Sequence, residues 1–352
     1  MAGNGTAVAA VFVVLLFFSV LIVSTVGIHA AGWHMASGLQ QERRERAEMK
    51  ELITERIELL KEDESPEWHG RGDAFFQESD VEKDRGYQVT VRDLSSAFNL
   101  NWLRKNIITR GGIGHYIIEG KSTDDLQQYR MSRGFGQNTG HYTEYFDPEF
   151  LEEYATCYGY WNVNVADEFS LEKIFNMRVN TIGGSGRFRL SLHPEIQAAV
   201  MLDTEALREK IREAGGVFED LWPYIFTEPA INVNFAPEMV LETLLSYEDF
   251  GVVDPAGTLS AIQSMKEVGD GISPQMLTEL IRLKEPKPED VEAGREKDRR
   301  IFEYLGCTTW FCEVRVLKAG AEGLRGVIAV LPPAEEGEAY DYRLIEMTGP
   351  GE

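Results

Sequence analysis

The longest uncharged stretch of the chain lies at its N-terminus. No Asp, Glu, Lys or Arg occurs from Ala2 to Gln41, and residues 6–26 (TAVAAVFVVLLFFSVLIVSTV) are almost wholly apolar. About 20 such residues, at a rise of about 1.5 Å each, span a hydrocarbon core of about 30 Å. A buried core helix is rarely apolar on every face over this length. The stretch therefore predicts one membrane-spanning helix, over residues 6–33.

A cleaved secretory signal is the main alternative, because residues 28–30 (IHA) resemble a peptidase site. Against it, no basic segment precedes the apolar run, which exceeds the usual length of about 7–15 residues. A membrane anchor is therefore favoured. The flanking charges oppose a translocated C-terminal side, because Arg43, Arg44 and Arg46 follow the anchor and nothing basic precedes it. Long domains, however, translocate regardless of charge.

The segment after the anchor predicts an amphipathic helix. A flexible break is expected at Gly27–Gly38, and residues 39–61 follow it. Their apolar side chains recur at steps of three and four positions, which places one stripe on the helix: Met49, Leu52, Ile53, Ile57 and Leu60. We expect one N-terminal helix over residues 6–61, half in lipid and half against a globular head. Pro66, Gly70 and Gly72 should end it.

Strand patterns occur once after this helix and three times near the C-terminus. Apolar and polar residues alternate, or an apolar run is bounded by prolines, in four segments: residues 87–92, 310–316, 325–331 and 340–347. The segments between the first strand and the other three have helical character.

These patterns predict an α+β fold with a discontinuous sheet. Residues 62–96 and 306–352 are expected to form a small β domain. Residues 97–305 are expected to form a large, mostly α-helical domain inserted between its strands.

The net charge of the chain falls on the head. Six acidic and six basic residues balance over residues 1–61, so the formal net charge of −23 falls on the remainder. Such a head repels phosphate backbones, which argues against nucleic acid as a partner. Acidity mostly reflects solubility, although carboxylates are also the ligands of calcium.

The three cysteines are too few for a disulfide scaffold and lack zinc spacing. Cys307 and Cys312 would form a disulfide in an oxidising periplasm only if a turn brought them together, because five residues of extended strand hold them apart. The pairing stays open, and Cys157 would then be free.

The middle of the chain holds an internal repeat. Residues 162–175 (NVNVADEFSLEKIF) match residues 232–245 (NVNFAPEMVLETLL), and residues 98–101 (FNLN) form a partial third copy. Asparagine caps turns and helix starts because its side-chain oxygen accepts early backbone N–H groups. The asparagines concerned are Asn99, Asn101, Asn162, Asn164, Asn232 and Asn234.

The second part of each of the two full copies predicts a helix with one buried face. Pro237 suits a first helical position, and Glu168 and Glu238 suit the positive helix end. The buried face would be formed by Leu171, Ile174 and Phe175, and by Leu241, Leu244 and Leu245. The repeat carries no reactive group, so it predicts architecture: duplicated helical elements.

The motifs, in their order, resemble the minor pseudopilin K family of type II secretion (general secretion pathway protein K, GspK). INVNFAPEMVLETLL is similar to that family's I-N-x-N-T-A-P-x-x-V-L-x-x-L signature, and VRDLSSAFNLNWL to its strand leading into F-N-L-N. VADEFSLEKIF and the closing segment GCTTWFCEVRVLKAGAEGLRGVIAVL resemble further elements of the family. With the N-terminal helix, the resemblance covers nearly the whole chain.

The resemblance implies that prepilin peptidase cuts between Gly5 and Thr6, with residues 1–5 as the leader and Thr6 N-methylated. Gly3 is a second candidate, and no basic leader precedes the site. Major pseudopilins carry Glu five residues into the mature chain, whereas this position is Ala10, as in K-type subunits. The implied fold packs the helix on a pilin-like antiparallel sheet.

The resemblance further implies a non-enzymatic subunit at the pseudopilus tip, anchored in the inner membrane with a periplasmic head. Its implied partners are I- and J-like minor pseudopilins, the major pseudopilin, the assembly platform, prepilin peptidase and exported substrates. No cofactor is required. Calcium binding by the head is implied, without nameable ligands.

Three other classes compete. The I-N-V-N-x-A pattern also opens helix-hairpin-helix DNA-binding modules, but the sequence after Leu245 is acidic where a phosphate contact would be basic. Enzyme motifs such as H-E-x-x-H, G-x-S-x-G and the P-loop are absent from the sequence. A generic membrane-anchored periplasmic binding protein remains the main alternative.

Overall fold

The computed structural model describes residues 4–63, 65–66, 68–77, 85–133, 138–165, 203–213, 217–218, 225–268, 271–284, 301–318, 323–333 and 339–348. Its contacts divide the chain into two compact units, Met1–Thr54 and Glu55–Glu352. The second unit contains the sheet, the short helices and the candidate site.

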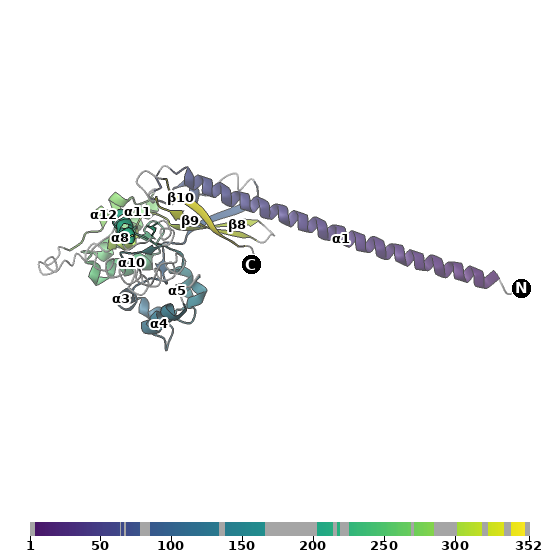
Figure 1. Cartoon of the computed structure of the whole chain (residues 1–352), viewed down its shortest axis with the longest axis horizontal. Helices are drawn as coiled ribbons and strands as arrows, with labels where there is room; N and C mark the ends of the chain where they lie inside the picture. Colours follow the sequence, from purple (N-terminus) through teal and green to yellow (C-terminus); the bar gives the residue numbers. More distant parts are fainter. Residues whose placement is uncertain are drawn as a thin grey trace. The chain divides into compact units, whose positions relative to one another are not determined.

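Helix α1 (Asn4–Lys61) is continuous, and Figure 1 draws it as one uninterrupted ribbon. The flexible break expected at Gly27–Gly38 is therefore wrong. Each glycine costs a helix about 1 kcal/mol relative to alanine, but no proline interrupts this stretch, so the surrounding helix formers carry the helix through. The part from Leu15 onward is long and apolar enough to cross a membrane by length and composition.

The two halves of α1 differ in burial as the sequence predicts. Large apolar side chains from Leu15 to Leu39 are exposed wherever the structure describes them. The predicted stripe is confirmed, because its members are at most 8% exposed: Met49, Leu52, Ile53, Ile57 and Leu60. Helix α1 ends at Lys61, before Pro66, as the sequence predicts.

The four predicted strands form one antiparallel sheet. They are β1 (Tyr87–Asp93), β8 (Phe311–Lys318), β9 (Leu324–Leu331) and β10 (Asp341–Thr348), in the order β1-β8-β9-β10. Strand β1 pairs with β8 over its whole length, from Tyr87 opposite Lys318 to Asp93 opposite Cys312. The strand nearest α1 in sequence thus pairs with a strand more than 200 residues away, so the chain between them leaves the sheet and returns to it.

The chain between β1 and β8 is a series of short helices and very short strands. The α-helices are α3 (Lys105–Arg110), α4 (Thr123–Arg133), α5 (Pro148–Glu153), α8 (Thr204–Glu213), α10 (Glu238–Ser246), α11 (Pro255–Val268), α12 (Pro274–Leu280) and α14 (Ile301–Tyr304). Single 3-10 turns are η1 (Ala74–Phe76), η2 (Ile113–Tyr116), η3 (Thr139–Tyr142) and η4 (Glu248–Phe250).

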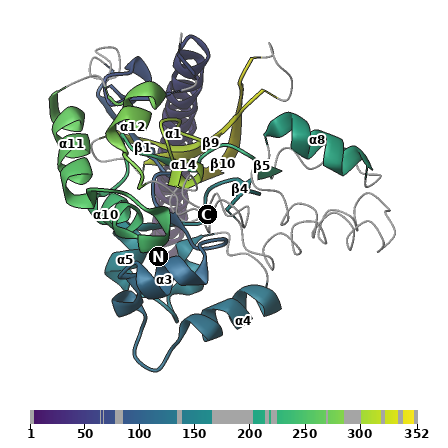
Figure 2. The same cartoon turned by 90° about the vertical axis from the view of Figure 1, so that its left-hand side faces the viewer.

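Three parallel pairs of two-residue strands lie between these helices. They are β2 (Phe98–Asn99) with β3 (Ala155–Thr156), β4 (Trp161–Asn162) with β5 (Ile225–Phe226), and β6 (Ile231–Asn232) with β7 (Leu305–Gly306). Each pair closes a loop of the chain, and its second strand leads within a few residues into the first strand of the next pair, or finally into β8. Figure 2 shows α3, α4 and α5 grouped together, α8 beside β4 and β5, and α10 with α11 and α12.

One core of the described residues joins these loops to the sheet. It runs from Phe98 through Trp102, Leu241 and Tyr304 to Leu331 of β9. The contacts keep residues 55–352 together and do not divide them at residues 97 and 305, the expected bounds of the inserted domain. The proposed boundaries of the inserted domain therefore stay a prediction.

Candidate functional site

The asparagine repeats form three equivalent turns, each starting on the first strand of a parallel pair. In each, Oδ1 of the first asparagine accepts the backbone N–H of the second: Asn99 from Asn101 at 3.0 Å, Asn162 from Asn164 at 2.9 Å, and Asn232 from Asn234 at 3.0 Å. An asparagine that bonds its own backbone two residues on forms an Asx turn. We call these three features the N-x-N turns.

The amide groups of the first two N-x-N turns bind the chain that follows the closing strand. Nδ2 of Asn99 donates to the carbonyl of Tyr158, and Nδ2 of Asn101 to that of Cys157. In the second turn the equivalent donors reach Glu228 and Thr227, at the same offsets after the closing strand: Asn162 to Glu228 and Asn164 to Thr227. The repeat therefore encodes a way of closing a loop, through side-chain amides that satisfy buried carbonyls.

The third N-x-N turn differs, because the segment around His69 enters it. The carbonyl of His69 accepts Nδ2 of Asn232 at 3.1 Å and of Asn234 at 2.9 Å. The His69 N–H donates to the carbonyl of Cys307 at 2.7 Å, and its Nδ1 accepts the N–H of Thr309 at 3.0 Å. The chain just after α1 is thereby fastened to the loop that leads into β8.

Asn234 completes this arrangement. Its Nδ2 also donates to the Ile272 carbonyl at 3.0 Å, and its Oδ1 accepts the Ile272 N–H at 2.7 Å. A Cβ on Gly271, whose φ is +130°, would lie 3.1 Å from Cα of Gly70 and 3.2 Å from Oδ1 of Asn234. Glycine is required there because two backbone segments meet at one amide.

His69 should make the fold sensitive to acid. It is fully buried, and burial lowers its pKa to about 4, against a partial opposing effect of the Asp63 carboxylate. Because the unfolded chain takes up the proton near pH 6.5, the stabilisation is complete above pH 6.5 and is lost as pH falls toward 4. The loss should reach about 3 kcal/mol.

Urea unfolding of the full chain at pH 7 and pH 4.5 checks this expectation. His69→Asn keeps an acceptor near the Nδ1 position but does not titrate, so its stability should fall less between the two pH values than that of the unchanged chain. An equal fall in both chains would show that the pKa of His69 is the same in the folded and unfolded chains, or that other groups carry the acid effect.

Asp93, at the end of β1, links the sheet to the same loop. Its carboxylate accepts the N–H groups of Ser95 and Ser96, at 2.7 and 2.8 Å, and the hydroxyl groups of Ser95 and Thr309. Burial raises its pKa, and these hydrogen bonds oppose the rise. Asp93 therefore holds the start of the inserted region against its end.

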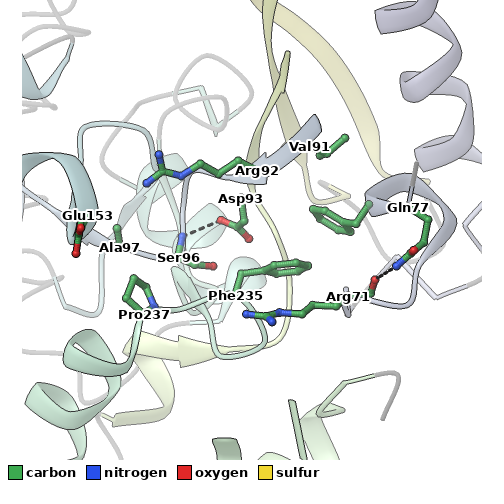
Figure 3. A pocket seen from close by; sticks show the side chains of 11 residues that line it. Arg71, Gln77, Val91, Arg92, Asp93, Ser96, Ala97, Glu153, Phe235 and Pro237 are labelled. Atoms are coloured by element: carbon green, nitrogen blue, oxygen red, sulfur yellow. Dashed lines mark hydrogen bonds between the residues drawn. The ribbon is translucent and has the colours of Figure 1, made fainter. Parts of the chain in front are cut away.

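A pocket of about 420 Å³ opens beside Asp93. Its wall comes from the loop after α1, from β1 and from the third N-x-N turn (Figure 3): Arg71, Phe76, Gln77, Val91, Arg92, Asp93, Ser96, Ala97, Glu153, Phe235 and Pro237. The rings of Phe76 and Phe235 lie with centroids 4.3 Å apart. In the view of Figure 3, Arg92 and Arg71 lie on opposite sides of Ser96 and Phe235.

The structure brings together only part of the residues singled out in the sequence. Asn232 and Asn234 lie at the His69 junction, and Asn99 and Asn101 serve their own loop. Asn162 and Asn164 close their own loop and also donate to Glu303, which lies just before β7. Pro237 precedes α10 as its N-cap residue, one position earlier than expected. Leu241, Leu244 and Leu245 are buried as predicted, and Glu168, Leu171, Ile174 and Phe175 lie outside the described residues.

The N-terminal and cysteine predictions have different outcomes. Gly5, Thr6 and Ala10 lie in the first turns of α1, and cleavage between Gly5 and Thr6 stays a prediction. Cys157, Cys307 and Cys312 are free thiols, so the disulfide that the sequence left open is not formed. Burial raises the pKa of the Cys307 thiol to about 12, which suits an inert buried cysteine.

No calcium ligands can be named from the part of the chain that the structure describes. Within it, no group of three or more His, Cys, Asp or Glu side chains is placed to hold a metal ion. Calcium binding therefore stays a prediction.

His69 and Arg56 are important residues that the sequence does not single out. Arg56 is 1% exposed, and its Nη1 donates to the carbonyls of Ala74, Phe75 and Gln77 at 2.5–3.2 Å. Arg56 looks like one of several helix-surface arginines, and His69 is a lone histidine in a turn-rich segment. Only the fold reveals what each one contacts.

Comparisons with known proteins give a distant likeness among solved structures. No family model matches the sequence, and no curated protein matches it. Among solved structures, the chain is similar to a chain in the crystal structure of the GspK-GspI-GspJ complex from the enterotoxigenic Escherichia coli Type 2 Secretion System. The match covers 90% of this chain and 98% of that chain, with 9% sequence identity and a TM-score of 0.35. A likeness this distant does not by itself decide the fold or the function of the chain.

Proposed function

We propose that the chain is a non-enzymatic minor pseudopilin at the pseudopilus tip of a type II secretion system. There it helps to initiate pseudopilus assembly and protein export across the outer membrane. It is anchored in the inner membrane by α1, with its head in the periplasm, until it is incorporated into the tip. This topology is opposite to the one that the arginines after the anchor favour, because basic residues tend to stay on the cytoplasmic side.

The observation that carries the proposal is the order of the elements. A long helix that is apolar and then amphipathic is followed by one strand, then by the N-x-N loops, then by three strands that complete the same sheet. The motifs that resemble the K-type family lie along this order, at β1 and the first N-x-N turn, at the third N-x-N turn and α10, and at β8 and β9. Ala10, in place of the glutamate of major pseudopilins, supports a tip position, because a tip subunit lacks a neighbour on one side.

The partners follow from the same role. We propose I- and J-like minor pseudopilins, the major pseudopilin, the assembly platform and prepilin peptidase as partners, with exported substrates reaching the head. Calcium binding by the head is part of the proposal. The proposed role requires no other cofactor. Nucleic acid is disfavoured as a ligand because the net charge is −23 and because Glu248 and Asp249 follow α10.

Co-purification tests the proposal. The full chain, extracted in mild detergent after co-expression with the I- and J-like pseudopilins of its own organism, should elute with both as one complex. An unrelated single-pass protein from the same membrane provides the control. Elution of the chain alone, or retention on DNA at physiological salt, would contradict the assignment and favour the rival classes.

A further inference from the structure

The pocket beside β1 has two arginines whose charges no neighbouring carboxylate takes up. Among the described residues, neither Arg71 nor Arg92 forms an ion pair. Nη2 of Arg92 donates one hydrogen bond to the carbonyl of Glu152 at 3.2 Å. In a chain with a net charge of −23, two arginines without a carboxylate partner on one pocket are unexpected.

Both arginines are carried by fixed backbone. Arg71 lies in a turn in which Asp73 Oδ2 accepts the Gly70 N–H at 2.7 Å, and its own carbonyl accepts Nε2 of Gln77. Arg92 lies in β1, paired with Glu313 of β8 across the antiparallel ladder. The backbone that carries the two arginines therefore needs little reordering when a ligand binds.

One of the two acidic side chains of the wall is already engaged by other groups. Asp93 accepts the hydrogen bonds from Ser95, Ser96 and Thr309 that tie down the inserted region. Glu153, at the end of α5, is exposed and lies on the pocket wall. The Asp93 carboxylate therefore serves the fold, and Glu153 is the remaining acidic side chain of the wall beside the two arginines.

A third cation lies close by. Lys266 of α11 donates to the Ala236 carbonyl at 2.8 Å, next to the wall residues Phe235 and Pro237. Burial and, to a smaller extent, the positive charge of Arg71 lower the pKa of Lys266 to about 8, against the opposing effect of Glu238. Arg71 and Lys266 thus repel each other, and an anion bound beside Arg71 would relieve that repulsion.

The remaining wall is apolar and aromatic. Phe76, Phe235, Pro237, Val91 and Ala97 line it, and its volume of about 420 Å³ lies in the range of small-ligand pockets. Figure 3 shows the Phe235 ring between the two arginines and the Arg71 side chain running beside it. A ligand that fills this space must present an apolar group to the rings and an anionic group to the arginines.

We propose that this pocket binds a carboxylate attached to an aromatic or aliphatic group, with Arg71 and Arg92 holding the carboxylate and Phe76 and Phe235 the apolar group. A guanidinium matches the two oxygens of a carboxylate in geometry and charge. A phosphate dianion fits less well, because Asp93 and Glu153 keep the net charge of the wall low. The assignment does not depend on the pseudopilin role.

Binding of 3-phenylpropanoate to the full chain in detergent micelles tests the site, measured by calorimetry against the uncharged 3-phenylpropanamide. The carboxylate should bind, and the amide should bind at least about tenfold more weakly, as expected when a charge-assisted hydrogen bond is lost. Arg71→Gln and Arg92→Gln should each weaken carboxylate binding by at least about tenfold. Equal binding of acid and amide, or of inorganic phosphate and acid, would overturn the proposal.

Arg110→Gln is the matched control, because Arg110 is an exposed arginine at the end of α3 and does not line the pocket. Its binding should be unchanged. Arg71→Gln carries the test if Arg92→Gln fails to fold, since Arg71 is exposed and its side chain makes no hydrogen bond among the described residues. Unchanged binding in a folded Arg71→Gln chain would refute the site.

A third ligand, N-acetyl-glycyl-phenylalanine, distinguishes two sources of the carboxylate: a polypeptide C-terminus and a free small molecule. Tighter binding of this compound than of 3-phenylpropanoate indicates the C-terminal residue of a polypeptide. Equal or weaker binding indicates a free small carboxylate.

Discussion

Asn234→Ala should lower the free energy of unfolding by about 3–5 kcal/mol, since each buried backbone group left without a partner costs about 1–3 kcal/mol. The substitution removes both partners of Ile272, whose N–H and carbonyl are buried with it, and one of the two amides on the His69 carbonyl. It also frees Gly271 from its close approach to the Asn234 side chain. Urea unfolding of the full chain in detergent, followed by tryptophan fluorescence, measures the loss.

Asn106→Ala is the control for this change. Asn106 is exposed in the first turn of α3, and alanine is the better helix former, so the stability should change by less than about 0.5 kcal/mol. A loss below about 1 kcal/mol for Asn234→Ala would mean that water replaces its amide, and the third N-x-N turn would then not hold the head together.

Arg56→Met should cost about 3 kcal/mol, because it strips three carbonyls of a donor while keeping most of the buried aliphatic volume. Those carbonyls, of Ala74, Phe75 and Gln77, belong to the turn that supplies Phe76 and Gln77 to the pocket. The change should therefore also weaken binding of 3-phenylpropanoate. The same unfolding and calorimetric measurements check both effects.

Two variants sharpen this prediction. Arg44→Met removes an exposed arginine that only pairs with Glu48 one turn away, so its effect should stay below about 0.5 kcal/mol. Arg56→Lys should recover only part of the loss, because an ammonium lacks the planar fork of donors. Full recovery by lysine would show that charge, and not the carbonyl contacts, is what this position supplies.

The sheet could be predicted from the sequence because its strands have a periodic pattern. Strands β1, β8, β9 and β10 lie within one residue of the predicted segments at nearly every end. Their pairing was also inferable, since a lone strand near α1 must find partners and only the C-terminal strands were available. The amphipathic half of α1 was predicted for the same reason, through its stripe from Met49 to Leu60.

The parallel pairs were not predictable. Strands β3, β5 and β7 are two residues long, too short to show any period, and each is recognised only by its pairing with β2, β4 or β6. The repeat did identify the asparagines, but their carbonyl partners lie some 40–165 residues away. The mostly helical insertion is accordingly a mixture of short helices and small parallel pairs.

The pocket combines residues from three distant segments, around Arg71, Arg92 and Phe235. Arg71 lies between Gly70 and Gly72, two of the residues expected to end the N-terminal helix, and the structure has a turn there. Phe235 lies in the repeat copy that begins at Asn232, where the sequence pattern singles out Asn232, Asn234 and Pro237 but not Phe235. Nothing local to any of these residues signals the others, because some 140 residues of sequence separate β1 from the third N-x-N turn.

The mass of the mature N-terminus tests the pseudopilin assignment most directly. The full chain is co-expressed with the prepilin peptidase of its own organism, purified from membranes in detergent and analysed by mass spectrometry. We predict a chain that begins at N-methylated Thr6, and an unprocessed chain when Gly5 is replaced by aspartate. A chain that keeps Met1 in the presence of the active peptidase, or one that begins after Ala30, would contradict the assignment.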